Sequence, residues 1–373
     1  MTPYGFRGMP LAIIGMACRL PGADNLEQYW RLLRDGLSAV AEFPPHRLDV
    51  ELYYHPDKGV LGKSYTKLGG LVPERPFDRN FCPISDDLIA SADLSHLSML
   101  EIAAAACRHA GLDPLALPLR NTGVFIGHAH GNLLRGEMNY STYIEEVAQF
   151  LHRIEAFVQL STDLRDAIIR DVVDRVRREK PHRVAGGKPD VAPNAVAGLI
   201  SEAFGLTGPY MAIDAACASS LYALAVAAQA LHHGQIDMAI VGGASHSTWQ
   251  KLVLFSQAQA LSATGSYPFD ARADGFIYAD GYAAVLVKTL SRALADGDEI
   301  YGVIRGIGVS CDGRGKSLWA PRKEGQIEAI RLTYADGLDP ARLQYIEAHS
   351  ASTRLGDAIE AHALATALGE CFP

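Results

Sequence analysis

The stretch MAIDAACASSLYALAVAAQALHH, residues 211–233, decides the fold and singles out one cysteine. Its first three residues are apolar and predict a short strand. Apolar residues then recur three and four positions apart from Leu221 to Leu231, which predicts a helix. Cys217 lies between the two. The sequence therefore predicts a sharp strand-to-helix turn with a cysteine near the N-terminus of the helix.

The surroundings of Cys217 favour a reactive thiol. Unpaired backbone N–H groups and the macrodipole at a helix N-terminus stabilise a thiolate, which is the nucleophilic form of cysteine. Alanine and serine residues on both sides leave room for a substrate to approach. A lone cysteine in an apolar context is usually a buried structural residue. The turn position and the small neighbours favour a nucleophile instead.

Composition limits the classes of protein to consider. The chain has 373 residues, of which 49% are hydrophobic, so it is long enough to bury a large core. A net charge of −8 argues against a nucleic-acid partner, because phosphate binding needs a basic face. Six cysteines at no metal-binding spacing are interpreted as free thiols in a reducing compartment. The sequence shows neither a secretory signal nor a membrane-spanning apolar run, so we expect a cytoplasmic protein.

Motifs along nearly the whole chain resemble one family. DAACASS resembles the active-site motif of the β-ketoacyl synthases, the condensing (ketosynthase) domains of polyketide and fatty-acid synthases. Further blocks resemble the family in its expected order: LAIIGMACRLPGADNLEQYWRLLRDGLSAV, GKSYTKLGGLV, FDRNFCPIS, FSQAQALS, PFDARADGFIYADGYAAVLVKTL, SCDGRGKSLWAPRKEGQ and IEAHSASTRLGD. The resemblance implies a ketosynthase domain of a type I or iterative polyketide synthase, in the thiolase superfamily. It also implies an α/β fold of five αβαβα layers, built from two similar halves.

The pattern of apolar stretches agrees with a layered α/β fold. Strands are predicted at residues 11–16, 123–128, 210–215, 238–243, 282–288, 301–310 and 343–349. Helices are predicted between most of them. We interpret residues 1–373 as a single ketosynthase domain. Its internal repeat is weak at the level of sequence.

Residues 131–190 differ from the rest in being rich in charge. Apolar residues from Ile154 to Val176 predict an amphipathic helix, closed by Pro181 and the glycine pair at 186–187. Condensing domains generally join these points by a shorter segment, so residues 131–190 are interpreted as a helical insertion. A solvated surface insertion is one interpretation. The other is a helix that lines the acyl entrance or the dimer face.

The resemblance implies a second catalytic residue, His349, in the block IEAHSASTRLGD. The predicted strand 343–349 would carry it at its end, projecting into a shared site. Its implied role is to hydrogen-bond the thioester carbonyl of the extender unit and so stabilise the enolate formed on decarboxylation. Phe255 resembles a family residue near the acyl pocket, although an aromatic residue in an apolar segment is more often part of the core.

Two departures from the family pattern concern the same end of the chain. The family has Gly-Thr-Gly-Thr after the histidine, and its threonines contact the phosphopantetheine arm. This chain has residues 350–353 as Ser-Ala-Ser-Thr, so Ser352 and Thr353 are the candidates for that contact. The family also continues into a Lys-Ser-Asn-x-Gly-His segment that carries a lysine and a second histidine. This sequence ends before it, and we therefore expect a domain truncated at its C-terminal end.

The implied reaction is a decarboxylative Claisen condensation, in which an acyl chain on Cys217 is extended by a malonyl-type unit. The implied partners are an acyl carrier protein, acyl and malonyl-type thioesters and a second copy in a homodimer. No metal, nucleotide, nucleic acid or membrane partner is expected, because phosphopantetheine arrives on the carrier protein. One alternative is a non-elongating acyl-binding or scaffold subunit. Another is an unrelated cysteine hydrolase, which would usually need a third residue to orient the histidine.

Overall fold

The computed structural model describes residues 9–116, 121–129, 133–180, 190–315, 320–335 and 337–369. Its strands are β1 (Leu11–Arg19), β2 (Val40–Glu42), β3 (Leu68–Gly70), β4 (Thr122–Gly127), β5 (Tyr210–Ile213), β6 (Met238–Ser245), β7 (Gly281–Thr289) and β8 (Gly302–Ile304). Its α-helices are α1 (Leu26–Asp35), α2 (Val50–Tyr53), α3 (Asp86–Ser91), α4 (Leu94–His109), α5 (Leu133–Gln149), α6 (Glu155–Val158), α7 (Thr162–Glu179), α8 (Ala195–Phe204), α9 (Ser219–His232), α10 (Trp249–Gln257), α11 (Leu290–Asp296), α12 (Lys323–Tyr334) and α13 (Arg354–Gly369).

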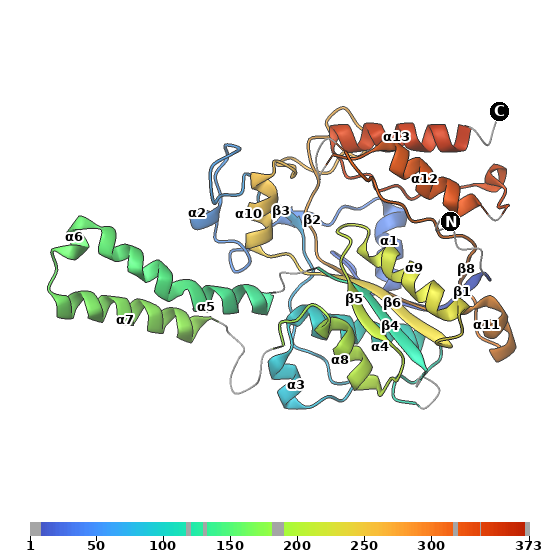
Figure 1. Ribbon diagram of the computed structural model, residues 1–373, viewed down its shortest axis with the longest axis horizontal. Helices are drawn as coiled ribbons and strands as arrows, with labels where there is room; N and C mark the ends of the chain where they lie inside the picture. Colours follow the sequence, from blue (N-terminus) through green and yellow to red (C-terminus); the bar gives the residue numbers. More distant parts are fainter. Residues whose placement is uncertain are drawn as a thin grey trace.

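A mixed sheet organises the body of the molecule (Figure 1). Its strand order is β5-β4-β6-β7-β1-β8. β4 pairs in parallel with both β5 and β6, whereas β7 pairs antiparallel with β6 and β1. The turn with Cys217 joins β5 to α9, so the parallel part of the sheet carries it.

Helices cover both faces of this sheet. α4 and α8 contact it on one side, where a large core of buried aliphatic residues includes Met99, Ile126 and Ile240. α9 covers the other side, where its alanines and Leu231 pack on Phe125 and neighbouring strand residues. The small side chains of α9 let the helix lie close to the strands, which positions its N-terminus against the sheet.

Most of the predicted strands are confirmed. β1, β4, β5, β6 and β7 each overlap the predicted range, and their ends differ by up to three residues. The prediction for 301–310 was too long, because only Gly302–Ile304 is strand. β8 pairs antiparallel with Leu11–Ile13 of β1, and no further residue of this segment pairs with β1.

The prediction of a strand at 343–349 is wrong. These residues adopt no regular structure, and Leu343, Tyr345 and Ile346 are exposed. A strand forms only where a neighbour satisfies its backbone hydrogen bonds, and no strand among the described residues lies beside this one. After residue 301 the described residues form β8, α12, the 3₁₀ turn Pro340–Arg342 and α13, and α12 and α13 pack together through Ile327 and Ala363.

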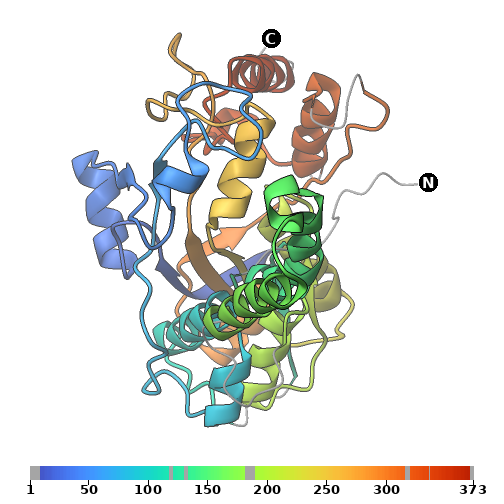
Figure 2. The same ribbon diagram turned by 90° about the vertical axis from the view of Figure 1, so that its left-hand side faces the viewer.

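A helical hairpin projects from the body (Figure 1). α5 leads outward and α7 returns, around a small core of their own formed by Ile144, Ala148 and Val173. Figure 2 turns this arm toward the viewer. The single helix predicted from Ile154 onward is divided in the structure, because Ser161 accepts the Leu164 N–H and starts α7 as a separate helix. The predicted closing residues, Pro181 and 186–187, lie outside the described residues.

The helices of the arm are the longest described ones, and α7 has 18 residues with many charges. Among the described helices, none combines the length and the apolar character that crossing a bilayer requires.

Candidate active site

Cys217 lies on the turn between β5 and α9, and its side chain is exposed. α9 begins at Ser219, so the thiol is next to the first turn of a 14-residue helix. The positive end of the helix dipole therefore lies beside the thiol. The predicted strand-to-helix turn and the position of the cysteine on it are confirmed.

Two side chains hold the turn in its conformation. The Ser219 hydroxyl accepts the Ala215 N–H at 2.9 Å and donates to the Ala216 carbonyl at 2.5 Å. The Asp214 carboxylate accepts the Ala216 N–H at 3.0 Å. Ala216 itself has φ +52°, a left-handed conformation that costs a residue with a side chain about 1 kcal/mol or more. The turn is therefore strained, and its hydrogen bonds offset the strain.

Two glycines bring the start of α9 onto the sheet. A Cβ added at Gly127, the last residue of β4, would lie 2.4 Å from the Ser220 nitrogen. A Cβ at Gly243 in β6 would meet the Ser220 Cβ at 3.3 Å. β4 therefore lacks room for a larger side chain at Gly127, and a Cβ at Gly243 would be in tight contact with α9. The glycines thus fix how far α9, and Cys217 with it, stands above the sheet.

Phe255 packs in a cluster with the aromatic residues Phe276 and Tyr278. Burial raises the pKa of the Tyr278 hydroxyl, and the nearby Asp280 carboxylate raises it further. Tyr278 is in turn 5.4 Å from the Phe255 ring, which also packs edge-on against Phe276 at 5.2 Å. Phe255 therefore belongs to a packed aromatic cluster. Its role in holding an acyl chain stays a prediction.

His349 lies on the irregular segment described above rather than at the end of a strand. Its backbone N–H donates to the Glu360 carboxylate at 2.6 Å, and the Ser350 N–H donates to the same carboxylate at 2.8 Å. The imidazole is exposed. Among the described residues, no hydrogen bond joins Cys217 to His349. The structure fixes the backbone of His349 through α13 and leaves its side chain accessible.

The two predicted phosphopantetheine contacts differ in exposure. Ser352 is fully buried, accepts the Tyr267 N–H at 2.8 Å through its hydroxyl, and accepts the Gly275 N–H at 2.8 Å through its carbonyl. Thr353 is half-buried. Ser352 thus fastens the loop after His349 to residues 267–275, and Thr353 has the more accessible side chain. Both substrate-binding roles stay predictions.

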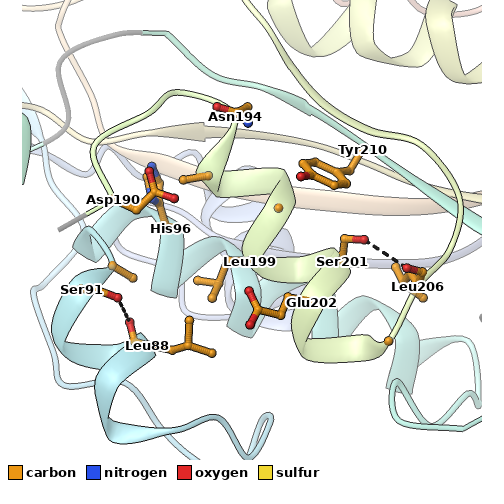
Figure 3. A pocket seen from close by; sticks show the side chains of 14 residues that line it. Leu88, Ser91, His96, Asp190, Asn194, Leu199, Ser201, Glu202, Leu206 and Tyr210 are labelled. Atoms are coloured by element: carbon orange, nitrogen blue, oxygen red, sulfur yellow. Dashed lines mark hydrogen bonds between the residues drawn. The ribbon is translucent and has the colours of Figure 1, made fainter. Parts of the chain in front are cut away.

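A separate pocket of about 460 Å³ lies between α3, α4 and α8 (Figure 3). His96, Asp190, Glu202 and Tyr210 contribute its polar lining. Burial lowers the pKa of His96 to about 4, although the nearby Asp93 raises it. None of the predicted site residues, all of which are described, lines this pocket.

Two pairs of histidines close in sequence, His128 with His130 and His232 with His233, were considered as metal ligands. His128 is buried, with Nδ1 2.9 Å from the Ala244 carbonyl oxygen, and His130 lies outside the described residues. α9 ends at His232, ahead of Gly234. No group of three or more metal-ligating side chains occurs in the part of the chain that the structure describes.

Comparison with known proteins decides the family. The β-ketoacyl synthase N-terminal domain matches residues 9–293, and the β-ketoacyl synthase C-terminal domain matches residues 301–371. The chain belongs to the β-ketoacyl synthase family. Cys217, its turn and the glycines beneath it lie within the N-terminal match, and His349 and Ser352 lie within the C-terminal one.

The relatives of this chain include polyketide synthases. The chain is 35% identical over 356 residues to a mycocerosic acid synthase-like polyketide synthase of Mycolicibacterium smegmatis, covering 94% of this chain and 15% of that protein. It is 36% identical over 357 residues to the erythronolide synthase EryA2 of Saccharopolyspora erythraea, covering 94% of this chain and 9% of that one. The chain thus spans a small part of these relatives' length.

Solved ketosynthases share the fold of this family member. The oxazolomycin ketosynthase domain OzmH KS7 of Streptomyces albus has a TM-score of 0.79 and 31% identity, and the match covers 97% of this chain and 56% of that one. The ketosynthase from module 6 of the bacillaene synthase of Bacillus subtilis has a TM-score of 0.76 and 29% identity over 97% of this chain and 55% of that one. The predicted thiolase-like α/β fold class is confirmed.

The sequence did not predict the residues whose side chains hold the backbone of the candidate site in place. Glu360 and Asp357 lie in the block DAIE, one helical turn apart on α13. Glu360 holds the backbone at His349, and the Asp357 carboxylate accepts the Phe269 N–H at 2.7 Å. The sequence signal for them was a pair of acidic residues, three positions apart, at the start of a predicted helix. Ser219, two residues after the cysteine, was recognised in the sequence only as a small residue near Cys217, and its hydrogen bonds were not predicted.

Proposed function

We propose that this chain performs the decarboxylative Claisen condensation of a polyketide or fatty-acid-like synthase. The observation that carries the proposal is the exposed Cys217 thiol at the start of α9, on a strained turn held by Ser219 and Asp214. Strain maintained next to an accessible nucleophile is typical of functional sites. Membership in the β-ketoacyl synthase family supports this chemistry.

The first half-reaction loads Cys217. Its thiolate attacks the carbonyl carbon of an acyl thioester on a carrier protein, a new carbon–sulfur bond forms, and the carrier's carbon–sulfur bond breaks. The carrier leaves as a thiolate that takes up a proton from solvent. The backbone N–H of Cys217 is the proposed donor to the oxyanion that develops on the carbonyl oxygen.

The second half-reaction makes the carbon–carbon bond. A malonyl-type thioester loses carbon dioxide, and the electron pair of the broken bond becomes an enolate. The proposed role of His349 is to hydrogen-bond the thioester oxygen, where that negative charge accumulates. The enolate carbon attacks the acyl group on Cys217, the thiolate leaves, and a β-ketoacyl thioester two carbons longer remains on the carrier.

The proposed partners follow from the same reaction. An acyl carrier protein would deliver both thioesters, with Thr353 and Ser352 near its phosphopantetheine arm and Phe255 near the acyl chain. The reaction as proposed uses no metal or nucleotide. A homodimer is supported by β5, which is an edge strand of the sheet and exposes Tyr210, because an uncovered edge strand readily pairs with another chain. The five free cysteines among the described residues are compatible with the cytoplasm.

The deciding experiment is intact mass spectrometry after incubation with an acyl thioester, beside a Cys217→Ala control. We expect a mass increase equal to the acyl group that disappears in the control. The loaded protein is then given malonyl carrier protein, and release of carbon dioxide with transfer of the acyl group to the carrier completes the test.

The rival functions predict other outcomes. A scaffold or acyl-binding subunit would release no carbon dioxide from malonyl carrier protein, and a cysteine hydrolase would return free acid without chain extension. A folded protein that takes up no acyl group at Cys217 would refute the proposal.

A further inference from the structure

The helix α10 carries a lysine whose ammonium has no partner in the described part of the chain. Lys251 is half-buried, and it lies one helical turn before Phe255. Its backbone N–H donates to the Thr248 hydroxyl that caps α10. Its ammonium, in contrast, makes no hydrogen bond or ion pair with any described residue. A lysine is seldom withdrawn from water without such a partner, so this position calls for a functional explanation.

Three carboxylates lie near this ammonium without pairing with it. Burial lowers the pKa of Lys251, whereas the nearby Asp93, Asp214 and Asp280 carboxylates raise it. Each carboxylate is bound elsewhere: Asp93 accepts two backbone N–H groups, Asp214 accepts one, and Asp280 accepts two in addition to the Arg47 guanidinium. The ammonium therefore keeps its hydrogen-bond donors available.

Lys251 lies at the same edge of the sheet as Cys217. β4 and β5 run parallel, and the first residue after β4, His128, donates its backbone N–H to the carbonyl of Ile213, the last residue of β5, at 3.1 Å. Asp214 follows there and begins the turn that carries Cys217. Burial lowers the pKa of His128, and the nearby Lys251 charge lowers it further. Since Lys251 is near both His128 and Asp214, its ammonium lies at the carboxyl ends of the parallel strands, where ligands of open α/β sheets bind.

The charges around Lys251 indicate which group it binds. One ammonium among three carboxylates leaves this edge with a surplus of negative charge, which repels an additional carboxylate. A neutral hydroxyl or keto oxygen meets no such repulsion and accepts a hydrogen bond from the ammonium. A plain alkyl chain would cover the ammonium and leave it without a partner, which is costly. The expected ligand is therefore an uncharged chain that carries oxygen.

We propose that Lys251 determines which acyl chain Cys217 accepts, by donating a hydrogen bond to a hydroxyl or keto oxygen along that chain. This inference rests on the proposed acyl loading of Cys217 and adds a substrate class to it. The acyl group extends from the thiol along the carboxyl edge of the sheet. Lys251 meets its oxygen, and Phe255, one turn further along α10, meets its carbon skeleton. A site that hydrogen-bonds a substrate oxygen discriminates against the analogue that lacks it.

Competitive acyl loading tests the preference. In separate mixtures, the hexanoyl thioester of N-acetylcysteamine competes with its 3-hydroxy, 5-hydroxy, 5-oxo and terminal-carboxylate (adipoyl) counterparts. Intact mass spectrometry measures the two adducts in each mixture, and a Cys217→Ala variant subtracts acylation at other residues. At least one hydroxy or oxo chain should load about tenfold faster than hexanoyl, and adipoyl should load more slowly than hexanoyl. Faster loading of adipoyl than of every other chain would overturn the proposal of an uncharged ligand.

Substitution of the lysine separates its hydrogen bond from the rest of the site. Lys251→Met keeps the apolar stem, so hexanoyl should load at least as fast as in the unmodified chain, and the preference for oxygen should disappear. Lys251→Arg keeps a cationic donor and should retain part of the preference. Lys323→Met, at a half-buried lysine that begins α12, is the matched control and should leave the preference unchanged. An oxygen preference that persists in Lys251→Met would overturn the proposal.

A stability measurement tests the unpartnered ammonium without any acyl group. An apolar side chain in place of a withdrawn charge that has no partner stabilises a protein, so Lys251→Met should raise the melting temperature by about 2 °C or more. An unchanged or lower melting temperature would show that the ammonium has a stabilising contact within the chain, and would overturn the proposal.

The loading experiment also distinguishes this proposal from the proposed function on which it rests. A folded chain that takes up none of the thioesters at Cys217 would refute the proposed function, and the role of Lys251 with it. Uptake of hexanoyl without a preference for any hydroxy or oxo chain would refute the role of Lys251 alone.

Discussion

The turn that carries Cys217 and the segment that carries His349 are built in different ways. Hydrogen bonds within residues 214–219 hold the turn around Cys217, and two strand glycines fix its height above the sheet. His349 lies on an irregular segment whose only described anchors are Glu360 on α13 and, beyond it, the contacts of Ser352. A local motif thus builds the nucleophile, whereas distant parts of the chain must position the histidine.

This contrast predicts that the greatest loss of stability comes from substituting a strand glycine that lies beneath the Cys217 turn. Gly127→Ala would place a Cβ 2.4 Å from the Ser220 nitrogen, so α9 must shift away from β4. Overpacking of this kind costs about 2–3 kcal/mol of unfolding free energy, which urea denaturation measures. Gly302→Ala is the matched control, because its Cβ would meet only Ile13 at 3.9 Å. Similar losses in both variants would show that Gly127 has no special role.

Acid should weaken the same end of the sheet, because His128 directly follows β4 and packs against His96. Burial holds the folded-state pKa of His96 at about 4. The unfolded chain takes up this proton near its ordinary pKa of 6.5, so stability is lost as the pH falls from 6.5 toward 4. By linkage, the loss between pH 7 and pH 5 is about 2 kcal/mol from this residue.

Urea denaturation at the two pH values measures the effect. His96→Gln should reduce the difference between pH 7 and pH 5. His362→Gln, at an exposed histidine on α13, should leave it unchanged. An unaltered difference in the His96 variant would assign the acid sensitivity to the other buried histidines, His128 and His246, whose pKa is also lowered by burial.

Ser219→Ala should separate reactivity from stability at the turn itself. The change removes both hydrogen bonds of the hydroxyl, costs about 1–2 kcal/mol, and releases the strain at Ala216. We expect iodoacetamide to alkylate Cys217 about tenfold more slowly, with a shifted pH profile. Adding Ala216→Gly should restore part of the rate, because glycine adopts a φ of +52° without strain. A changed melting temperature with an unchanged alkylation profile would limit Ser219 to a structural role.

The smallest effect is expected in the irregular segment that carries His349. Glu360→Gln keeps the shape of the side chain but weakens its hydrogen bonds to the His349 and Ser350 N–H groups, which costs about 1 kcal/mol or less. Limited proteolysis should accelerate within residues 343–350, and alkylation of Cys217 should not change. A slower alkylation in this variant would show that the two regions are already coupled in this chain.

The sequence predicted the elements that rest on short-range patterns. The three- and four-residue spacing of α9 and the apolar runs of the central strands place Cys217 correctly. The sequence failed where long-range pairing decides, since LQYIEAH has the apolar pattern of a strand but no described neighbour to pair with. It also merged α6 and α7, because the Ser161 cap interrupts a continuous apolar periodicity. Ser219 and Glu360 act through backbone contacts, which residue types alone do not disclose.

The small core of the arm has a consequence for motion. Ile144, Ala148 and Val173 form a cluster of their own, and the Asp93 carboxylate, which accepts the Leu134 N–H at 2.7 Å, ties the start of α5 to the cap of α4. A hairpin with its own core can open as one cooperative unit. Its amide hydrogens should therefore exchange with solvent together, well before those of β4 and β6. The arm can melt and refold while the sheet keeps Cys217 in place.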